Sequence, residues 1–240
     1  MDNKQHVQLP KEMSQKDLTP QDQLVYLAIK KYMNKDTKTA YPSLATLKND
    51  TGASVITIRK CIDSLVEKDY ITVIQEGRRL KYIFSEYNGF EPFSYDFLDR
   101  KDLTFTEKSY LAASQQYMFT DVEGIGKMSY TNKELSDKIN MSESTISKCN
   151  RSLVNKDYLQ ILKSSETGGI KDLKIFQLDK LGQAIIWKLK EHENAIKENT
   201  EDIKELNKKV NDLEKRLTDR DKLINKLLNE KSNISIDYSF

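Results

Sequence analysis

A repeated segment is the feature that most limits how this chain of 240 residues can fold. Residues 54–71 read SVITIRKCIDSLVEKDYI, and residues 142–159 read SESTISKCNRSLVNKDYL. Eleven of these eighteen positions are identical at an offset of 88 residues, and the tetrapeptide KDLT also occurs twice upstream, at 16–19 and 101–104. The repeat therefore spans a module of about 85 residues, which is long enough to bury a modest core. One fold used twice is the prediction that follows.

The first module predicts three helices followed by a β-hairpin. Thr19 and Ser54 precede apolar residues at helical spacing and suit the N-cap positions of two of these helices. Gly52 suits a left-handed C-cap that ends the helix between them. The segments 71–74 and 80–84 are rich in β-branched and aromatic residues and flank a turn that contains glycine. Three helices and a hairpin in this order are the winged-helix arrangement.

The second module repeats this order, with a first helix predicted from about Thr106 to Tyr117 and a third helix after Ser142. We therefore predict a mainly α fold with small β-wings, in which two tandem winged helix-turn-helix domains precede a long C-terminal coiled-coil helix. The predicted boundaries are 1–84 for the first domain, 85–100 for an acidic aromatic connector, 101–181 for the second domain, 182–232 for the coiled coil and 233–240 for a flexible tail.

From Leu189 onward, apolar residues follow a heptad repeat. Position a is apolar through six heptads, whereas position d is interrupted by His192, Asn199 and Arg220. Isoleucine or valine at a with leucine at d favours a parallel dimer, and a solvated single helix is the alternative. The residues that we expect at the dimer interface are Ile196, Ile203, Leu206, Val210, Leu213, Leu217, Ile224 and Leu227.

Residues 41–71, YPSLATLKNDTGASVITIRKCIDSLVEKDYI, carry a wider pattern. A Pro-Ser helix start is followed by leucine, by Gly-x-Ser, by an arginine in the third helix, and by a closing leucine before Lys-x-Tyr-Ile. In these features the run resembles bacterial winged helix-turn-helix regulators, including the GntR-like type and the phage and plasmid type with tandem modules. The resemblance covers about residues 7–84 directly and 93–181 through the repeat. In the second module Asn140 replaces the glycine and Ser147 replaces the arginine.

The resemblance implies double-stranded DNA as the partner and transcriptional regulation as the function. Two alternatives stay open at the level of sequence. One is a replication initiator or replisome organiser that binds repeats within an origin. The other is an adaptor whose winged helices bind protein. Transcription or replication proteins are therefore further candidate partners.

Helical spacing selects the surface of each third helix that would face DNA. With Ile58, Cys61 and Leu65 pointing inward, the more polar face of the first recognition helix points outward, and the equivalent face of the second does the same. With the N-cap serines and the cations of the wings, the candidate DNA-binding residues are Ser54, Ile56, Thr57, Arg59, Lys60, Asp63, Arg78, Arg79, Lys81, Ser142, Ser144, Thr145, Ser147, Lys148, Arg151 and Lys171.

The two outward faces differ where base reading is expected. A lysine shared by both helices suits phosphate contacts, which carry no sequence information. Arg59 is replaced by Ser147, and Asp63 is replaced by Arg151, so these positions are candidates for contacts with base edges. A charged residue on an exposed helix face is otherwise simply solvated. The second wing mixes lysines with acids, so the first module is expected to bind more tightly.

The sequence offers little material for catalysis or metal binding. Its two histidines lie far apart in the chain, and Cys61 and Cys149 occupy equivalent positions where each is expected to be buried and unpaired. The stretch 124–127, GIGK, lacks the remaining residues of a phosphate-binding loop and is predicted to be a surface loop. We expect no enzymatic activity, no metal and no cofactor.

Two features of the sequence favour a cytoplasmic protein. No run of about 18 apolar residues is present, so no membrane span is predicted. The first ten residues lack the apolar core of a secretory signal.

Residues 1–84 hold fourteen basic and ten acidic side chains, whereas residues 85–102 hold two basic and five acidic side chains. Phosphate would be repelled by that acidic connector, so its five aromatic side chains are expected to pack between the modules rather than stack on bases.

Overall fold

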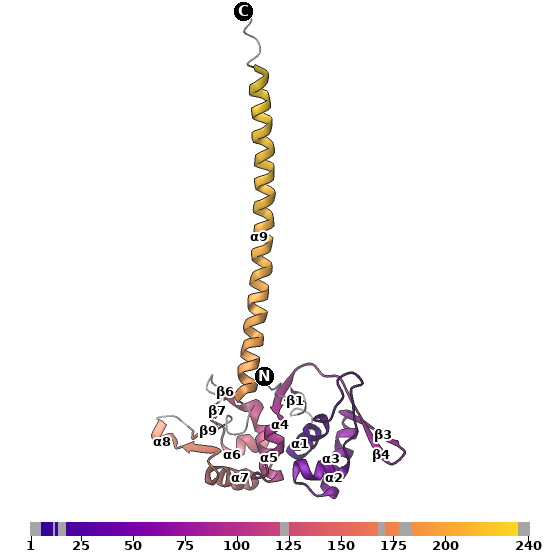
Figure 1. Cartoon of the computed structure of the whole chain (residues 1–240). Coiled ribbons are helices and arrows are strands. Elements are labelled where there is room, and N and C mark those ends of the chain that lie inside the picture. The colour runs from indigo at the N-terminus through magenta and orange to yellow at the C-terminus, as the bar shows by residue number, and fades with distance from the viewer. Residues whose placement is uncertain are drawn as a thin grey trace, which may run out of the picture. The chain divides into compact units, whose positions relative to one another are not determined.

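The computed structural model describes residues 6–11, 13, 18–120, 125–167, 171–177 and 184–234. Side chains are described for these residues apart from 120, 167, 184–198 and 231–234. The described residues up to Lys188 form one unit, and those from Leu189 onward form a second (Figure 1). The end of the predicted flexible tail, 235–240, lies outside the described residues.

Residues 20–84 form three helices and a three-stranded antiparallel sheet in which β4 lies between β2 and β3. The register pairs Glu76 with Arg79, so the β3–β4 hairpin closes through the two residues Gly77 and Arg78. The elements are α1 (Pro20–Lys30), β2 (Thr39–Ala40), α2 (Leu44–Thr51), α3 (Val55–Glu67), β3 (Ile71–Glu76) and β4 (Arg79–Phe84).

Short polar residues and a glycine set the ends of these helices. The Ser54 hydroxyl oxygen accepts a hydrogen bond from the Thr57 amide at 3.1 Å, and Thr19 forms a capping box with Asp22. Gly52 ends α2 in the left-handed conformation, with a φ of 79°. The predicted caps at Thr19, Gly52 and Ser54 are confirmed.

Residues 105–177 repeat this order of elements with additions. The sheet has the strand order β6-β7-β9-β8, all antiparallel. The elements are α5 (Phe105–Ser114), the 3-10 helix η2 (Gln115–Tyr117), β6 (Phe119–Thr120), β7 (Ile125–Met128), α6 (Asn132–Ile139), α7 (Glu143–Asn155), β8 (Leu159–Leu162), α8 (Ser164–Thr167) and β9 (Leu173–Gln177).

Two details of the second repeat differ from the predictions. The first helix is α-helical only to Ser114 and continues as the 3-10 helix η2. Residues 125–127, predicted to belong to a surface loop, form most of β7, where Gly126 pairs with Phe176. Gly126 and Met128 are buried and alternate with half-buried neighbours, which is the two-residue period of a strand. The loop prediction was wrong because this alternation is short and includes a glycine.

Left-handed residues end the helices of both repeats at matching places. Asn140 ends α6 with a φ of 53°, so the residue that replaces glycine in the second repeat still adopts the glycine conformation. Asp69 and Asp157 follow α3 and α7 with φ values of 60° and 56°. In both repeats the amide of the next tyrosine donates to a leucine carbonyl five residues earlier, at 2.9 Å. The repeated Lys-Asp-Tyr therefore specifies a helix end of the Schellman type.

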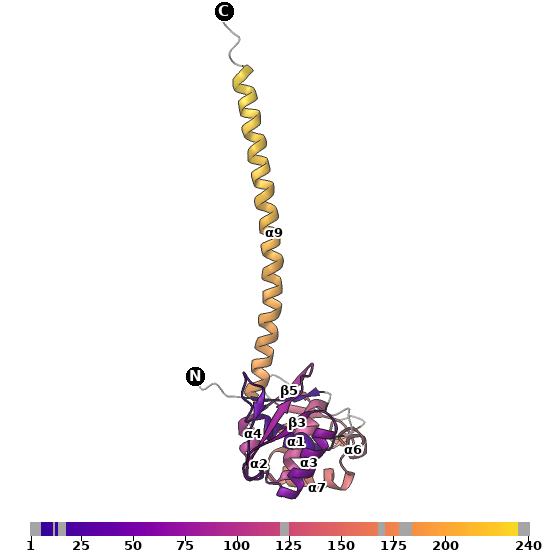
Figure 2. The same ribbon diagram turned by 90° about the vertical axis from the view of Figure 1, so that its right-hand side faces the viewer.

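The connector is part of the core of the first unit. Strand β1 (His6–Pro10) pairs antiparallel with β5 (Phe90–Ser94), which leads into α4 (Tyr95–Asp99). Phe93 and Phe97 are buried with ring centroids 5.6 Å apart, and Tyr87 stacks on Tyr70 at 4.9 Å. Figure 2 labels β5 and α4 in the same unit as α1, α2 and α3. These aromatic side chains pack against protein.

An ion pair between the partly exposed Lys156, which follows α7, and the buried Glu107 of α5 joins the third and first helices of the second repeat. The Lys156 Nζ lies 2.8 and 2.9 Å from the two carboxylate oxygens of Glu107, whose side chain is 4% exposed. Burial alone would raise the pKa of Glu107, but hydrogen bonds from Lys156, Ser152 and Thr104 hold it below its usual value. In the first repeat the donor is a neutral hydroxyl instead of an ammonium group, because the Ser64 hydroxyl donates to the Asp22 side chain at 3.2 Å.

We expect Lys156→Met to lower the free energy of unfolding by about 3 kcal/mol, because the Glu107 carboxylate is then left buried without its cation. Urea unfolding at neutral pH measures this loss. Lys68→Met, at the equivalent position of the first repeat, is the matched control and should cost little. Since the folded pKa of Glu107 is depressed, the stabilisation is present above the usual carboxyl pKa and disappears as the pH falls through the folded value. Equal losses in the two variants would contradict this account.

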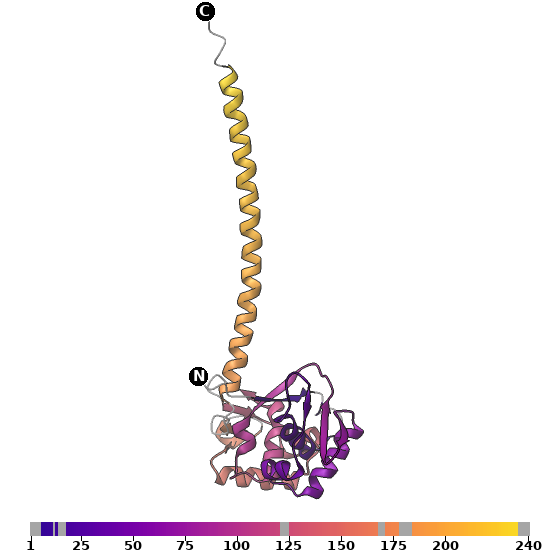
Figure 3. The same cartoon turned by 45° about the vertical axis from the view of Figure 1, so that its right-hand side comes forward.

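The second unit consists of most of α9 (Ala184–Ile234), which is one continuous helix of 51 residues (Figure 3). Its described side chains, from 199 to 230, are all exposed. Seven of the eight residues predicted at a dimer interface are among them, and the side chain of Ile196 lies outside the described residues. Within the described residues, no helix combines the length and apolar character needed to cross a membrane.

Candidate nucleic-acid interface

The outward face of α3 carries the side chains that the sequence placed there. Ile58, Cys61, Ile62 and Leu65 are buried on the inner face, and this 3.6-residue period directs the intervening positions outward. The exposed residues of this face are Ser54, Ile56, Arg59, Lys60 and Asp63, and Thr57 is half-buried. The orientation therefore agrees with the prediction, while contact with DNA stays a prediction.

The first turn of α3 is held by its own hydroxyl groups. The Ser54 and Thr57 side chains are 2.9 Å apart, and Ser54 also accepts the Thr57 amide. In α7 the same arrangement joins Ser142 to Thr145, with hydroxyl groups 2.8 Å apart. All four residues were predicted to contact DNA; Ser54 and Ser142 are N-caps, and Thr57 and Thr145 are their hydrogen-bond partners. Each helix N-terminus then presents its remaining amides and the positive end of its dipole to the exterior.

A groove lies between the β3–β4 hairpin, which we call the wing, the start of α2 and the outer face of α3. It has a volume of about 830 Å³. Three arginines line this groove, which we call the arginine groove: Arg59 from α3, and Arg78 and Arg79 from the hairpin. No ion pair holds any of the three within the described part of the chain. The other lining residues are Tyr32, Tyr41, Pro42, Ser43, Leu44, Thr46, Gln75 and Leu80.

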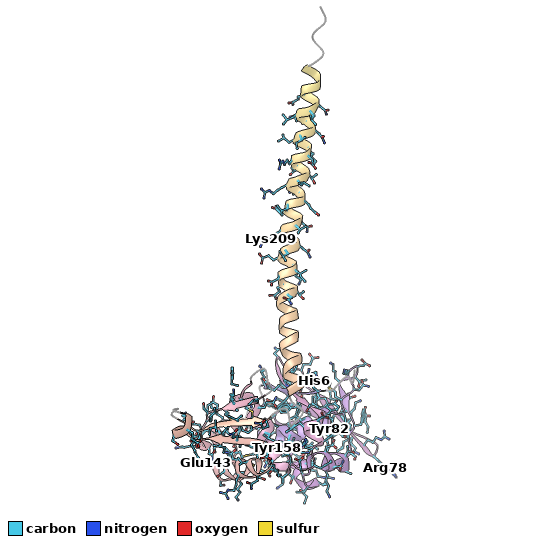
Figure 4. All side chains as sticks on the ribbon, turned by 60° about the vertical axis from the view of Figure 1, so that its left-hand side comes forward. His6, Arg78, Tyr82, Glu143, Tyr158 and Lys209 are labelled. Atoms are coloured by element: carbon cyan, nitrogen blue, oxygen red, sulfur yellow. The ribbon has the colours of Figure 1, made fainter. Side chains whose placement is uncertain are left out.

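The hairpin turn places Arg78 at the tip of the wing. Gly77 has a φ of 59°, which permits the tight two-residue turn, and the Gln75 side chain donates to the Gly77 carbonyl at 2.7 Å. Arg78 is exposed and lies at the edge of the unit, away from the core (Figure 4). A guanidinium in this position can reach a phosphate or the floor of a minor groove.

Lys81, also predicted to bind DNA, is placed differently. Its Nζ lies 2.9 Å from the Glu76 carboxylate across the hairpin, and the hydrogen bond to Glu76 raises the pKa of its ammonium group. Lys81 does not line the arginine groove. Its charge is compensated within the wing, so a phosphate gains less from it than from Arg78 or Arg79.

The second repeat presents a face of the same shape but a different charge. Ser142, Ser144, Ser147, Lys148 and Arg151 are exposed on or next to α7, and Thr145 is half-buried. The wing cations are paired, because Lys171 lies 2.5 Å from Glu134 and Lys163 lies 3.0 Å from Asp172. The hydrogen bond from Lys171 lowers the pKa of Glu134 to about 2. Lys171, predicted to bind DNA, is therefore engaged within the protein.

Sequence reasoning missed the aromatic wall of the arginine groove. Tyr32 and Tyr41 line it, and the Tyr32 hydroxyl donates to the Asp50 carboxylate at 2.7 Å. The signal was the dipeptide Tyr-Met, which occurs in both repeats at positions 32–33 and 117–118. In the second repeat Tyr117 contacts Tyr130, with ring centroids 6.1 Å apart.

Residues 16–71 match the family model of a helix-turn-helix domain. The matched segment includes α1, α2 and α3 and ends at Ile71, the first residue of β3. The helix-turn-helix domain therefore carries the exposed face of α3 described above, and its presence supports DNA binding. The match does not extend to the wing or to the second repeat. No curated protein matches the chain.

No candidate metal site competes with this face in the described residues. Among them, no three histidine, cysteine, aspartate or glutamate side chains lie together in a way that could hold a metal ion. The two cysteines are buried and free. The helix-turn-helix domain with its arginine groove is therefore the candidate functional site.

Proposed function

We propose that this protein binds double-stranded DNA in a sequence-specific manner through two tandem winged-helix modules, and that it acts as a regulator of transcription of the phage or plasmid type. The arginine groove carries the proposal. Arg59, Arg78 and Arg79, which form no ion pair with a described carboxylate, line one groove beside the exposed face of α3, and α3 lies inside the segment that matches a helix-turn-helix domain. This is the charge distribution that a polyanion requires.

In this proposal α3 enters the major groove. Arg59 and Asp63 are one helical turn apart and face outward, so both can meet base edges, arginine with guanine and aspartate with cytosine. Lys60 contacts phosphate beside them. Arg78 and Arg79 extend the contact along the backbone or into the adjoining minor groove. The protein supplies binding and positioning, and we propose no catalytic step.

We further propose that α9 forms a parallel coiled-coil dimer. Its apolar seam is exposed in the single chain, with Leu206 and Leu213 both 59% exposed and Leu217 63% exposed. A second copy of the same helix covers such a seam with matching residues. Lys209 with Glu214 and Arg216 with Asp221 would pair between the two chains at positions g and e. In the single helix Lys209 contacts Glu205 instead, at 2.8 Å.

The second module is proposed to read a different sequence or to contribute less to affinity. Two of its wing lysines, Lys163 and Lys171, are paired with acids, and its exposed recognition positions are Ser147 and Arg151 instead of Arg59 and Asp63. A footprint with two identical half-sites for each chain would therefore contradict the proposal.

Glu134→Gln tests the charge balance of the second wing. Glutamine keeps the capping position of α6 but releases Lys171, so we expect affinity for any duplex to rise about twofold at low salt, by up to one additional phosphate contact. Fluorescence anisotropy with a labelled duplex measures the change. Lys171→Ala should leave affinity nearly unchanged. If Lys171→Ala lowers affinity as strongly as Arg78→Ala does, the lysine is not engaged by Glu134 in solution.

Selection of bound duplexes from random and genomic DNA by the full chain tests the proposed function. We expect one enriched sequence, and affinity that falls with salt by about one log unit per log of salt for each phosphate contacted. Genomic sites at promoters support regulation, and clustered repeats within an origin support replication initiation instead. Wild type and an Arg59→Ala/Arg78→Ala variant that are equally inert on all DNA would leave the protein-binding adaptor as the explanation.

A further inference from the structure

The second repeat contacts the C-terminal end of α2, within the helix-turn-helix domain of the first. The Lys108 Nζ, from α5, donates to the Asp50 carbonyl at 2.9 Å and to the Leu98 carbonyl at 2.6 Å. The Lys101 Nζ donates to the Asn49 carbonyl at 2.8 Å. Asn49 and Asp50 belong to the last turn of α2. Two ammonium groups of the second repeat thus donate hydrogen bonds to main-chain carbonyls at the C-terminal end of α2.

Electrostatics explains why lysines suit this place. The last carbonyls of a helix lack intrahelical partners and form the negative end of its dipole. Lys108 is only 2% exposed, and burial lowers its pKa to about 8. No salt bridge to Lys108 occurs within the described part of the chain, so main-chain carbonyls are its direct partners. A lysine buried at this cost needs those carbonyls in fixed positions.

Other contacts reach the same turn. The Asp50 carboxylate accepts the Tyr32 hydroxyl at 2.7 Å and lies 3.6 Å from the Lys31 Nζ. Lys31 in turn pairs with Asp99 of α4 at 2.5 Å. Next to Asp50 and Thr51, Gly52 packs close to α5, since a Cβ at Gly52 would lie 3.9 Å from the Phe105 amide nitrogen. The turn between α2 and α3 is therefore in contact with α4 and α5.

The lysine contact between the two repeats is not reciprocal. Helices α1 and α5 lie side by side in the middle of the first unit (Figure 1). At the offset of 85 the counterpart of Lys108 is Gln23, whose buried side chain makes no hydrogen bond to a described residue. At the offset of 88 the counterpart of Asp50 is Lys138. The first repeat consequently lacks the lysine that a reciprocal contact would need.

We infer that the second repeat is a positioning element for the first, in which Lys108 and Lys101 hold the end of α2 and thereby set the angle at which α3 meets DNA. The inference rests on the proposed function and assigns a role to the second module that needs no DNA contact of its own. Lys108 is a positioning residue, since it acts on the interface through α2.

The test uses the full chain, the duplex enriched by selection, and a scrambled duplex of equal length and composition. We expect Lys108→Met to weaken binding to the selected duplex about tenfold, comparable to one mismatched base pair, with less than about twofold change on the scrambled duplex. Lys108→Arg retains charge and donors and should restore most of the preference. Lys133→Met, which removes an exposed lysine of α6, is the matched control and should behave as wild type.

Circular dichroism at the assay temperature shows whether each variant is folded. Equal loss on both duplexes would overturn the inference, and so would lower thermal stability with an unchanged preference. If Lys108→Met does not fold, the exposed Lys101→Met takes its place, with a smaller loss of preference expected and an unchanged preference overturning the inference. A wild-type chain that does not prefer the selected duplex would overturn the proposed function itself. If the wild-type chain prefers the selected duplex and the lysine variants keep that preference, only the positioning inference is overturned.

Discussion

Replacing Arg59, Arg78 and Arg79 together by alanine is expected to weaken binding to the selected duplex by about a thousandfold at low salt, since each arginine contact with a base or phosphate contributes about 1–3 kcal/mol. All three side chains line one groove and have no carboxylate partner in the described residues, so no internal ion pair is lost with them. Stability should change little, because all three are exposed.

Anisotropy titrations across a salt series measure this effect. The slope of log affinity against log salt should become shallower by up to about two, one each for the phosphate contacts of Arg78 and Arg79, because Arg59 is proposed to contact a base edge. The matched control is Lys215→Ala/Lys222→Ala/Lys226→Ala, which removes the same number of positive charges from exposed positions of α9. If the control loses as much affinity as the arginine variant, net charge rather than the groove governs binding.

Leu206→Asp/Leu213→Asp is expected to abolish the coiled-coil dimer. Both leucines are at position d, where the partner helix would bury them, and an unpaired carboxylate is costly in an apolar interface. We expect the dissociation constant of the dimer to rise at least about a thousandfold, so that the variant sediments as a monomer at micromolar concentration. Affinity for a duplex with two half-sites should then fall toward that of a single half-site, because the effective concentration of the second subunit is lost.

Asn211→Asp/Thr218→Asp is the control for this variant. It adds the same two negative charges at position b, on the side of the helix away from the seam. Analytical ultracentrifugation should find it dimeric. A wild-type chain that sediments as a monomer would remove the coiled coil from the proposal, and a control that is also monomeric would point to charge repulsion along the helix.

Local features of the fold could be predicted from the sequence because their causes are local. Ser54, Gly52 and Thr19 set helix ends through bonds within three or four residues, and the burial of Ile58 and Cys61 follows from helical spacing. The outward face of α3 followed in the same way. Each of these features depends on a short stretch of chain that can be read without its surroundings.

Contacts between distant residues could not be predicted. The pairing of β1 with β5 joins segments more than eighty residues apart, and neither segment has a period that identifies its partner. Lys171 was expected to be available for DNA, yet it lies beside Glu134, which is 37 residues away in the sequence. The role of Lys108 depends on the packing of α5 against the end of α2, which helical spacing alone does not specify.

The two cysteines at equivalent positions give the chain a chemical reporter of local unfolding. Each repeat has one free thiol, at the same place in its third helix, and both are buried. Burial raises the pKa of Cys149 to about 11 and that of Cys61 further, so the reactive thiolate hardly forms while the repeat stays closed. Alkylation of each thiol can therefore proceed only through local unfolding of its own repeat. The rates at the two positions would report separately how often each half of the tandem opens.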